Sequence, residues 1–240
     1  MLQTILNVLY PARCPICGDI IAQAAQMICE ACKGQLIYIS EPRCKRCSKP
    51  IEEEEQEYCS DCNRKHFHYN RGFAVWVYNE AMKNSIAAFK YHSKKEYSSF
   101  YIHEMLRHYR KVIQGLSVDA ILPVPIHRSK YIERGYNQAE LLAKGIGREL
   151  KLPVYSKLLI RNKRTLPQKN LSDRERLENL SHAFEMRVED LKIDMKSIKK
   201  VLLVDDIYTT GSTVEACSIL LKSQGIEEVY FIVLCIGKGY

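Results

Sequence analysis

Thirteen consecutive residues decide the fold of this 240-residue chain: VLLVDDIYTTGST, residues 201–213. Four apolar residues open the stretch, which is typical of a parallel strand that is covered on both faces. Asp205 and Asp206 follow, and residues 213–223 then carry apolar side chains at helical spacing. The polar residues are therefore predicted to form a strand-to-helix turn at the carboxyl end of a strand, where open α/β sheets bind ligands.

The predicted turn suits a phosphorylated sugar. Gly211 allows a ligand to approach the backbone, and the N–H groups at the start of a helix favour a phosphate dianion. Because Asp205 and Asp206 would repel that anion, we expect them to bind sugar hydroxyls or a divalent cation beside it. An acidic turn that only caps a helix is the alternative, but it would not require the whole pattern. The chain contains neither GxxxxGK[ST] nor GxGxxG.

The stretch resembles the signature of the type I phosphoribosyltransferases, which use phosphoribosyl diphosphate with Mg²⁺. The resemblance implies that Asp205 and Asp206 bind the ribose hydroxyls. It also implies that the 5′-phosphate is bound by the loop residues Thr209, Thr210, Gly211, Ser212 and Thr213.

Eight of the ten cysteines form four C-x-x-C pairs, each beginning fifteen residues after the one before. The pairs are Cys14/Cys17, Cys29/Cys32, Cys44/Cys47 and Cys59/Cys62. Two such pairs complete a tetrahedral site, so we predict two structural Zn²⁺ ions, whereas a redox function would explain one pair and not four. Sequential pairing would give two zinc ribbons and interleaved pairing a cross-braced module, and the eleven-residue connections 18–28 and 48–58 favour ribbons. Cys217 and Cys235 lie in apolar patterns and are predicted to be core residues.

Strands and helices alternate in the rest of the sequence, which predicts an α/β fold: a type I phosphoribosyltransferase-like parallel sheet with helices on both faces, plus a small N-terminal zinc-ribbon module. We assign residues 1–66 to an N-terminal helix and the double zinc ribbon, and residues 67–240 to the phosphoribosyltransferase-like domain. Further strands are predicted at 73–78, 120–122 and 229–236, and a helix at 139–150.

The first ten residues are apolar but do not resemble a signal peptide. Leu2, Ile5, Leu6 and Leu9 instead share one face of a short docking helix, with no basic region before them and no cleavage site after them. No apolar run approaches the length of about 20 residues that spans a bilayer. We therefore expect a cytoplasmic protein without a transmembrane segment.

The net charge of +8 is unevenly placed along the chain. Residues 1–70 carry 8 Lys/Arg and 9 Asp/Glu, a net charge of −1, whereas residues 71–240 carry 28 and 19, a net charge of +9. Within the second part, residues 157–176 hold seven basic and two acidic residues. Such a run is often only a solvated surface, but beside a phosphate site it indicates a basic ligand-binding loop, and the excess charge permits nucleic-acid binding.

Six shorter motifs follow one another along the chain. They are residues 10–18, Phe89-Lys90-Tyr91, Pro123 to His127, Arg134 to Gln138, Arg164 to Asn179 and Ala183-Phe184. Together with residues 201–213 they resemble the ComF family of competence-associated phosphoribosyltransferase-like proteins. The resemblance covers nearly the whole chain and implies a role in natural transformation: the handling of single-stranded DNA beside a helicase and other DNA-uptake proteins, at the inner face of the membrane. It implies no known reaction.

Five residues are candidates for the pyrophosphate side of the site: His127, Arg128, Arg134, Arg164 and Arg176. Together with Mg²⁺ they would neutralise the charge of the departing pyrophosphate. The sequence is also compatible with ligand binding without catalysis, and it indicates neither an acceptor nor a general base. Four tyrosines are candidates for stacking on DNA bases: Tyr91, Tyr97, Tyr131 and Tyr136. The alternatives are a metabolic phosphoribosyltransferase for a nucleobase or amine, which has little use for zinc ribbons, and a ligand-sensing regulator of duplex DNA, which would normally bring a helix-turn-helix.

Overall fold

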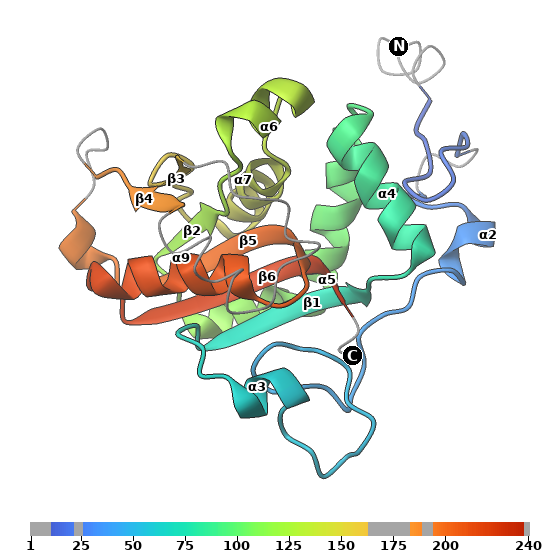
Figure 1. The fold of residues 1–240 in the computed structure, drawn as a ribbon. Coiled ribbons are helices and arrows are strands. Elements are labelled where there is room, and N and C mark those ends of the chain that lie inside the picture. Colours follow the sequence, from blue (N-terminus) through green and yellow to red (C-terminus); the bar gives the residue numbers. More distant parts are fainter. Residues whose placement is uncertain (1–10, 22–25, 163–182, 189–193, 238–240) are drawn as a thin grey trace.

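The computed structural model describes residues 11–21, 26–162, 183–188 and 194–237. At its centre is a parallel sheet of four strands in the order β1-β6-β5-β2 (Figure 1). These strands are β1 Arg71–Val77, β2 Ala120–Pro123, β5 Lys200–Tyr208 and β6 Glu228–Ile236. A separate antiparallel pair consists of β3 Leu159–Arg161 and β4 Phe184–Met186.

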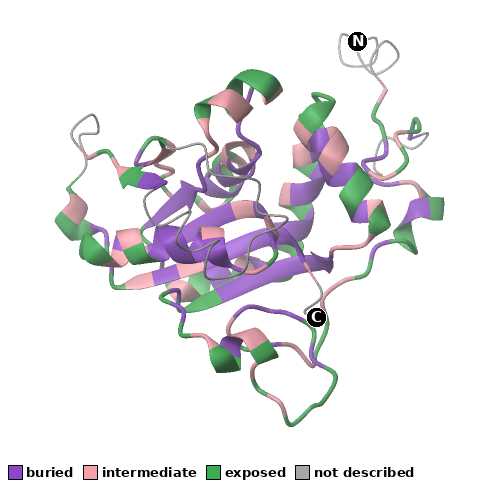
Figure 2. Cartoon of the chain, viewed as in Figure 1, coloured by how far each residue is buried: buried purple, intermediate pink, exposed green. Residues whose placement is uncertain are grey.

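Helices cover both faces of the sheet, as predicted. They are α2 Glu30–Lys33, α3 Ser60–Arg64, α4 Glu80–Tyr91, α5 Tyr97–Leu116, α6 Arg128–Arg134, α7 Gln138–Leu150 and α9 Ser212–Ser223, with a 3₁₀ turn, η2, at Met195–Ser197. Helices α4, α5 and α7 share a hydrophobic core with Leu202 and Val204, whereas α9 packs on the face that holds Val201 and Leu203. All four of these β5 side chains are fully buried, which explains why the strand reads as a continuous apolar run (Figure 2).

The predicted strands and the helices near 139–150 and 213–223 are confirmed, but the short helices α2 and α3 and the helices α5 and α6 were not predicted. Helix α5 spans twenty residues, and its buried face includes Phe100, Tyr101, Met105 and Ile113. Helix α6 lies between the motifs Pro123 to His127 and Arg134 to Gln138, in a segment for which the sequence analysis predicts no helix. The predicted N-terminal helix at residues 1–10 lies outside the described residues. Within the described part of the chain, no helix combines the length and apolarity needed to cross a bilayer.

The two cysteine-rich segments pack against opposite faces of the sheet. The first ribbon, residues 14–32, shares its core with α4 and α5, and Ser85 Oγ donates a hydrogen bond to the carbonyl of Pro15 at 2.5 Å. The second ribbon, residues 44–62, shares its core with β6 and α9. Figure 1 shows the resulting separation of α2 from α3. Each ribbon is therefore part of a core that it shares with the sheet.

The connection between the ribbons runs along the outer edge of β1. Ile39 N–H donates to the carbonyl of Val75 at 2.9 Å, and Val77 N–H donates to the carbonyl of Ile37 at 2.8 Å. That pairing is antiparallel, whereas at the opposite edge residues 153–155 pair with β2 in a parallel arrangement. Both edges of the parallel sheet are thus hydrogen-bonded to irregular chain.

Candidate functional site

The eight paired cysteines form two sets in sequential order. Cys14, Cys17, Cys29 and Cys32 make one set, and Cys44, Cys47, Cys59 and Cys62 make the other. Within each set all sulfur atoms lie within 4.8 Å of one another, and the Sγ atoms of Cys17 and Cys29 are 3.7 Å apart. Zn–S bonds of about 2.3 Å in a tetrahedron place sulfur atoms about 3.8 Å apart. The geometry fits one structural Zn²⁺ per set, with no position open for a reacting water.

The two ribbons share the same local turn. Gly18 N–H donates to Cys14 O and Ser48 N–H to Cys44 O, both at 2.9 Å, and Gly18 and Ser48 both have positive φ angles, +81° and +69°. Glycine adopts this left-handed conformation without cost, whereas serine does not. The Ser48 hydroxyl donates to the carbonyl of Gly72 at 2.8 Å. Serine is the less favourable residue for this backbone conformation, but its side chain anchors the second ribbon to β1.

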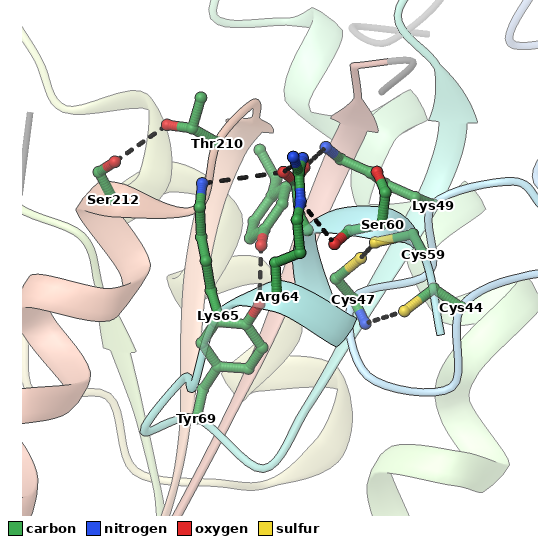
Figure 3. A network of polar contacts seen from close by, with 12 residues as sticks. Cys44, Cys47, Lys49, Cys59, Ser60, Arg64, Lys65, Tyr69, Thr210 and Ser212 are labelled. Atoms are coloured by element: carbon green, nitrogen blue, oxygen red, sulfur yellow. Dashed lines mark hydrogen bonds and ion pairs between the residues drawn. The ribbon is translucent and has the colours of Figure 1, made fainter. Parts of the chain in front are cut away.

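The second ribbon is the more deeply buried of the two. All four of its cysteines are buried, whereas Cys17 of the first ribbon is exposed. Beside the second set, Lys49 forms an ion pair with Asp61 at 2.6 Å, and the lysine side chain is only 6% exposed (Figure 3). This cation lies close to the thiolates and compensates part of the charge that four thiolates place around one Zn²⁺ ion.

The two acidic residues of the predicted sugar site lie inside the last part of β5, not in the predicted turn, because the strand keeps its pairing with β6 as far as Tyr208. Asp206 is buried, and its N–H donates to Asp205 Oδ1 at 2.8 Å. Lys90, from the last turn of α4, places its Nζ 2.8 Å from Asp206 Oδ1. Burial, together with the neighbouring Asp206 carboxylate, raises the pKa of Asp205 to about 7. Near neutral pH the edge therefore holds one carboxylate that is paired with a lysine and one that is close to its protonation midpoint.

The loop after β5 has the form expected of an anion-binding turn. Gly211 has φ +81° and is the N-cap of α9, and Thr210 and Ser212 hydroxyl oxygens lie 3.0 Å apart (Figure 3). Residues 209–213 line a small hollow together with Asp205. The structure thus brings Asp205 and all five predicted loop residues together at this hollow, whereas Asp206 does not line it and pairs with Lys90 of α4.

The turn after β2 lies beside the end of β5. Val124 N–H donates to the carbonyl of Val204 at 2.9 Å, which brings the following residues to the same edge. His127 is the N-cap of α6, and its ring nitrogen accepts a hydrogen bond from Ser129 N–H at 3.2 Å. Arg128 is exposed. The predicted pyrophosphate residues Arg164 and Arg176 lie outside the described residues.

The motif Phe89-Lys90-Tyr91, for which the sequence analysis proposes no role, lies beside the predicted site. Lys90 pairs with Asp206 of β5, Tyr91 Oη accepts a hydrogen bond from Arg134 at the end of α6 at 2.9 Å, and the carbonyl of Phe89 accepts one from Tyr136. The prediction that four tyrosines are available for stacking is wrong for two of them. Tyr97 is buried at the start of α5 and Tyr136 is buried between α6 and α7, whereas Tyr91 and Tyr131 are about half exposed.

Comparison with known proteins agrees with this architecture. The double zinc ribbon domain family matches residues 5–63, and the phosphoribosyl transferase domain family matches residues 137–239. Orotate phosphoribosyltransferase from Aeropyrum pernix aligns with 59% of this chain and 61% of its own, with 14% identity and a TM-score of 0.34.

Two curated relatives match over most of their length. The DNA utilization protein YhgH of Escherichia coli K12 is 28% identical over 94% of this chain and 97% of its own. Competence protein F of Haemophilus influenzae is 30% identical over 90% of this chain and 93% of its own. The chain therefore belongs to the ComF family, the family of competence protein F.

Proposed function

We propose that the carboxyl edge of the sheet binds phosphoribosyl diphosphate, and that this site serves a protein of natural transformation. One observation carries the proposal: two carboxylates in the last part of β5 are followed, five residues after Asp206, by a glycine turn from which α9 begins. An ionised carboxylate only accepts hydrogen bonds, which suits ribose hydroxyls, and a helix N-terminus suits a phosphate. The site thus offers carboxylates for the ribose hydroxyls and, next to them, N–H groups for the 5′-phosphate.

The proposed contacts follow from this arrangement. Asp205 and Asp206 would hold the ribose hydroxyls, and residues 209–213 would donate hydrogen bonds to the 5′-phosphate. Lys90 supports the assignment, because it already compensates the charge of Asp206 and so reduces the repulsion between the carboxylates and an anionic ligand.

The pyrophosphate group is proposed to face the turn after β2. His127, Arg128 and Arg134 belong to that side, and Arg164 and Arg176 are proposed to join them. Arg134 is held by Tyr91 and by Gln138 Oε1 at 3.0 Å, and these two contacts leave further guanidinium N–H groups for the ligand. Mg²⁺, when bound with the ligand, would neutralise phosphate charge, and the carboxylates of Asp205 and Asp206 are the groups proposed to lie nearest to it.

A second observation favours the handling of single-stranded DNA. A cavity of about 680 Å³ lies between α5 and α7 and is lined by Arg107, Arg110, Lys111 and Arg148, with Glu149 as an acidic neighbour. Lysine and arginine side chains neutralise phosphates and supply most of the sequence-independent affinity for nucleic acids. We propose that DNA contacts this surface as well as the basic segment 157–176.

The biological context is proposed from the relatives, whose names are competence protein F and DNA utilization protein. In this context the partners would be a competence helicase and other DNA-uptake proteins, at the cytoplasmic face of the membrane.

Ligand-dependent thermal stabilisation tests the site. Phosphoribosyl diphosphate with Mg²⁺ should raise the melting temperature by mass action, by an amount that grows with its concentration. The Asp205→Asn/Asp206→Asn variant should lose this shift, and Thr210→Ala should keep part of it because the backbone N–H groups remain. Asp119→Asn is the matched control, since Asp119 accepts hydrogen bonds from Lys199 and Lys200 at the opposite end of β5. A double variant that binds as well as the parent would show that the site is elsewhere.

Pyrophosphate release separates an enzyme from a binding protein. The parent is incubated with phosphoribosyl diphosphate, Mg²⁺ and one acceptor at a time, including nucleobases, amines and single-stranded DNA. Release with a nucleobase or amine would favour a metabolic transferase, whereas binding without release would favour a ligand site.

A further inference from the structure

Two tyrosines connect the second zinc ribbon to the phosphate loop, residues 209–213. The hydroxyl oxygens of Tyr69 and Tyr208 are 2.7 Å apart, and both side chains are buried (Figure 3). Tyr208 is the last residue of β5, immediately before the loop, and Tyr69 lies between α3 and β1. Burial raises the pKa of both hydroxyls, so both stay protonated and one donates to the other.

Tyr208 lies directly against the turn of the phosphate loop. A Cβ atom added to Gly211 would lie only 2.4 Å from Tyr208 Oη, so the glycine backbone packs against the tyrosine hydroxyl. The ring of Tyr208 is itself fixed, since it stacks on Phe231 with ring centroids 4.9 Å apart and an interplanar angle of 1°. The position of the Tyr208 hydroxyl therefore determines where the turn of the loop can lie.

Tyr69 is fixed from the other side by the second ribbon. Cys47, Cys62 and Tyr69 belong to the same buried cluster, and the Tyr69 ring also stacks on Phe67 at 5.0 Å. Besides the Ser48 contact, Gly72 N–H donates to the carbonyl of Arg46 at 2.7 Å. The chain that leaves the ribbon is therefore held at the ribbon, in the core and at the start of β1.

The residue next to Tyr69 contacts the far end of the loop. His68 N–H donates to Glu215 Oε2 at 2.9 Å, and His68 Nδ1 lies 2.5 Å from Glu215 Oε1. Glu215 is buried in the first turn of α9, and its own N–H donates to the carbonyl of Gly211 at 2.8 Å. His68 and Tyr69 thus contact the chain on both sides of the phosphate loop.

We propose that the second zinc ribbon is a positioning element for the phosphate loop and acts on it through Tyr69 and Tyr208. The inference rests on the proposed role of residues 209–213 in binding a phosphate. Metal binding supplies the folding energy of a ribbon of this size. The loop conformation that binds the ligand therefore depends on the zinc site of the second ribbon, although the cysteines of that site do not contact the phosphate themselves. The first ribbon packs instead against α4 and α5.

The test removes one hydroxyl and leaves both ribbons intact. In Tyr69→Phe, amide exchange of residues 209–213 should accelerate, and the affinity for phosphoribosyl diphosphate with Mg²⁺, measured by titration calorimetry, should fall about threefold to tenfold. Elemental analysis should still find the zinc content of the parent. The loss of affinity in the double variant Tyr69→Phe/Tyr208→Phe should be smaller than the sum of the losses in the two single variants. The reason is that each single variant leaves one buried hydroxyl unpaired, whereas the double variant leaves none.

The matched control is Tyr101→Phe, which breaks a comparable buried pair with Ser85 Oγ at 2.5 Å, beside the first ribbon. It should lower the melting temperature while loop exchange and ligand affinity stay at the parent values. If Tyr69→Phe behaves like this control, the positioning role is wrong and the tyrosine pair is only structural. If the parent fails to bind phosphoribosyl diphosphate, the proposed function is wrong, and loop exchange in Tyr69→Phe still decides whether the ribbon positions the loop.

Discussion

Lys90 Nζ lies 2.8 Å from Asp206 Oδ1, although the two residues are 116 positions apart in the sequence. The side chains are 17% and 11% exposed, so this ion pair is largely shielded from water. It ties the end of α4 to the end of β5 and balances one of two adjacent carboxylates. The acidic site is therefore built from two elements that only the tertiary fold brings together.

Removing the lysine should destabilise the protein in a pH-dependent way. Breaking a buried ion pair from one side costs about 3 kcal/mol, and 1 kcal/mol corresponds to about 2–4 °C in a chain of this size. We therefore expect Lys90→Met to lower the melting temperature by several degrees at pH 8, and by less at pH 5.5, where Asp205 is protonated. Lys83→Met is the control, because Lys83 pairs with Glu80 on the exposed surface and its loss should change little. Equal effects of the two variants in thermal melts would contradict the assigned role of Lys90.

The raised pKa of Asp205 predicts how stability changes with pH. The folded protein binds this proton with a pKa of about 7, against 3.8 for the ordinary carboxyl, so unfolding releases the proton between these values. The stabilisation is fully present below pH 3.8 and is lost as the pH rises through 7. Asp205→Asn should accordingly melt higher than the parent at pH 8, with the difference shrinking toward pH 5. A difference that is independent of pH would show that Asp205 does not titrate in this range.

Zinc content and the two ribbons can be tested together. Elemental analysis of the purified protein should find two Zn²⁺ per chain, and a ratio near one would contradict the two-site interpretation. Cys47→Ser removes a buried ligand from the core shared with β6, so it should lower the melting temperature of the whole chain. Cys17→Ser removes an exposed ligand and should cost less. The opposite ranking would show that the second ribbon is not part of the shared core.

DNA binding should depend on the cavity between α5 and α7. In fluorescence anisotropy with single-stranded DNA, log K should fall linearly with log salt, with a slope of about −0.7 per phosphate contact. Neutralising Arg107, Arg110 and Lys111 together should flatten that slope. A matched variant that neutralises three exposed cations of the ribbons, Lys33, Lys45 and Arg64, should leave it unchanged. If the slope flattens in the ribbon variant and not in the cavity variant, the DNA-binding surface lies on the ribbons.

The parts of the fold that were predictable are those with local causes. Residues 201–213 specify a strand, a turn and a helix start within one short stretch, and the fifteen-residue repeat specifies the cysteine sets. Helix α5 also has a local cause, because Phe100, Tyr101 and Met105 lie on one face at helical spacing.

The parts that were not predictable depend on distant contacts. The sequence shows Phe89-Lys90-Tyr91 as a motif, but only the packing of α4 brings it to Asp206. Likewise, the burial of Tyr97 and Tyr136 follows from neighbours elsewhere in the chain, and a single tyrosine carries no local sign of it. The division of the ribbons between the two faces has the same origin.

The pairing of residues 37–39 with β1 has a consequence for dissecting the protein. An unpaired edge strand is a template on which other chains can add, and natural proteins protect such edges. A fragment that starts at residue 67 would lose this protecting segment and would present β1, with its row of buried apolar side chains, to its neighbours. We therefore expect such a fragment to self-associate, so that the cysteine-rich N-terminal segment also protects the sheet against aggregation.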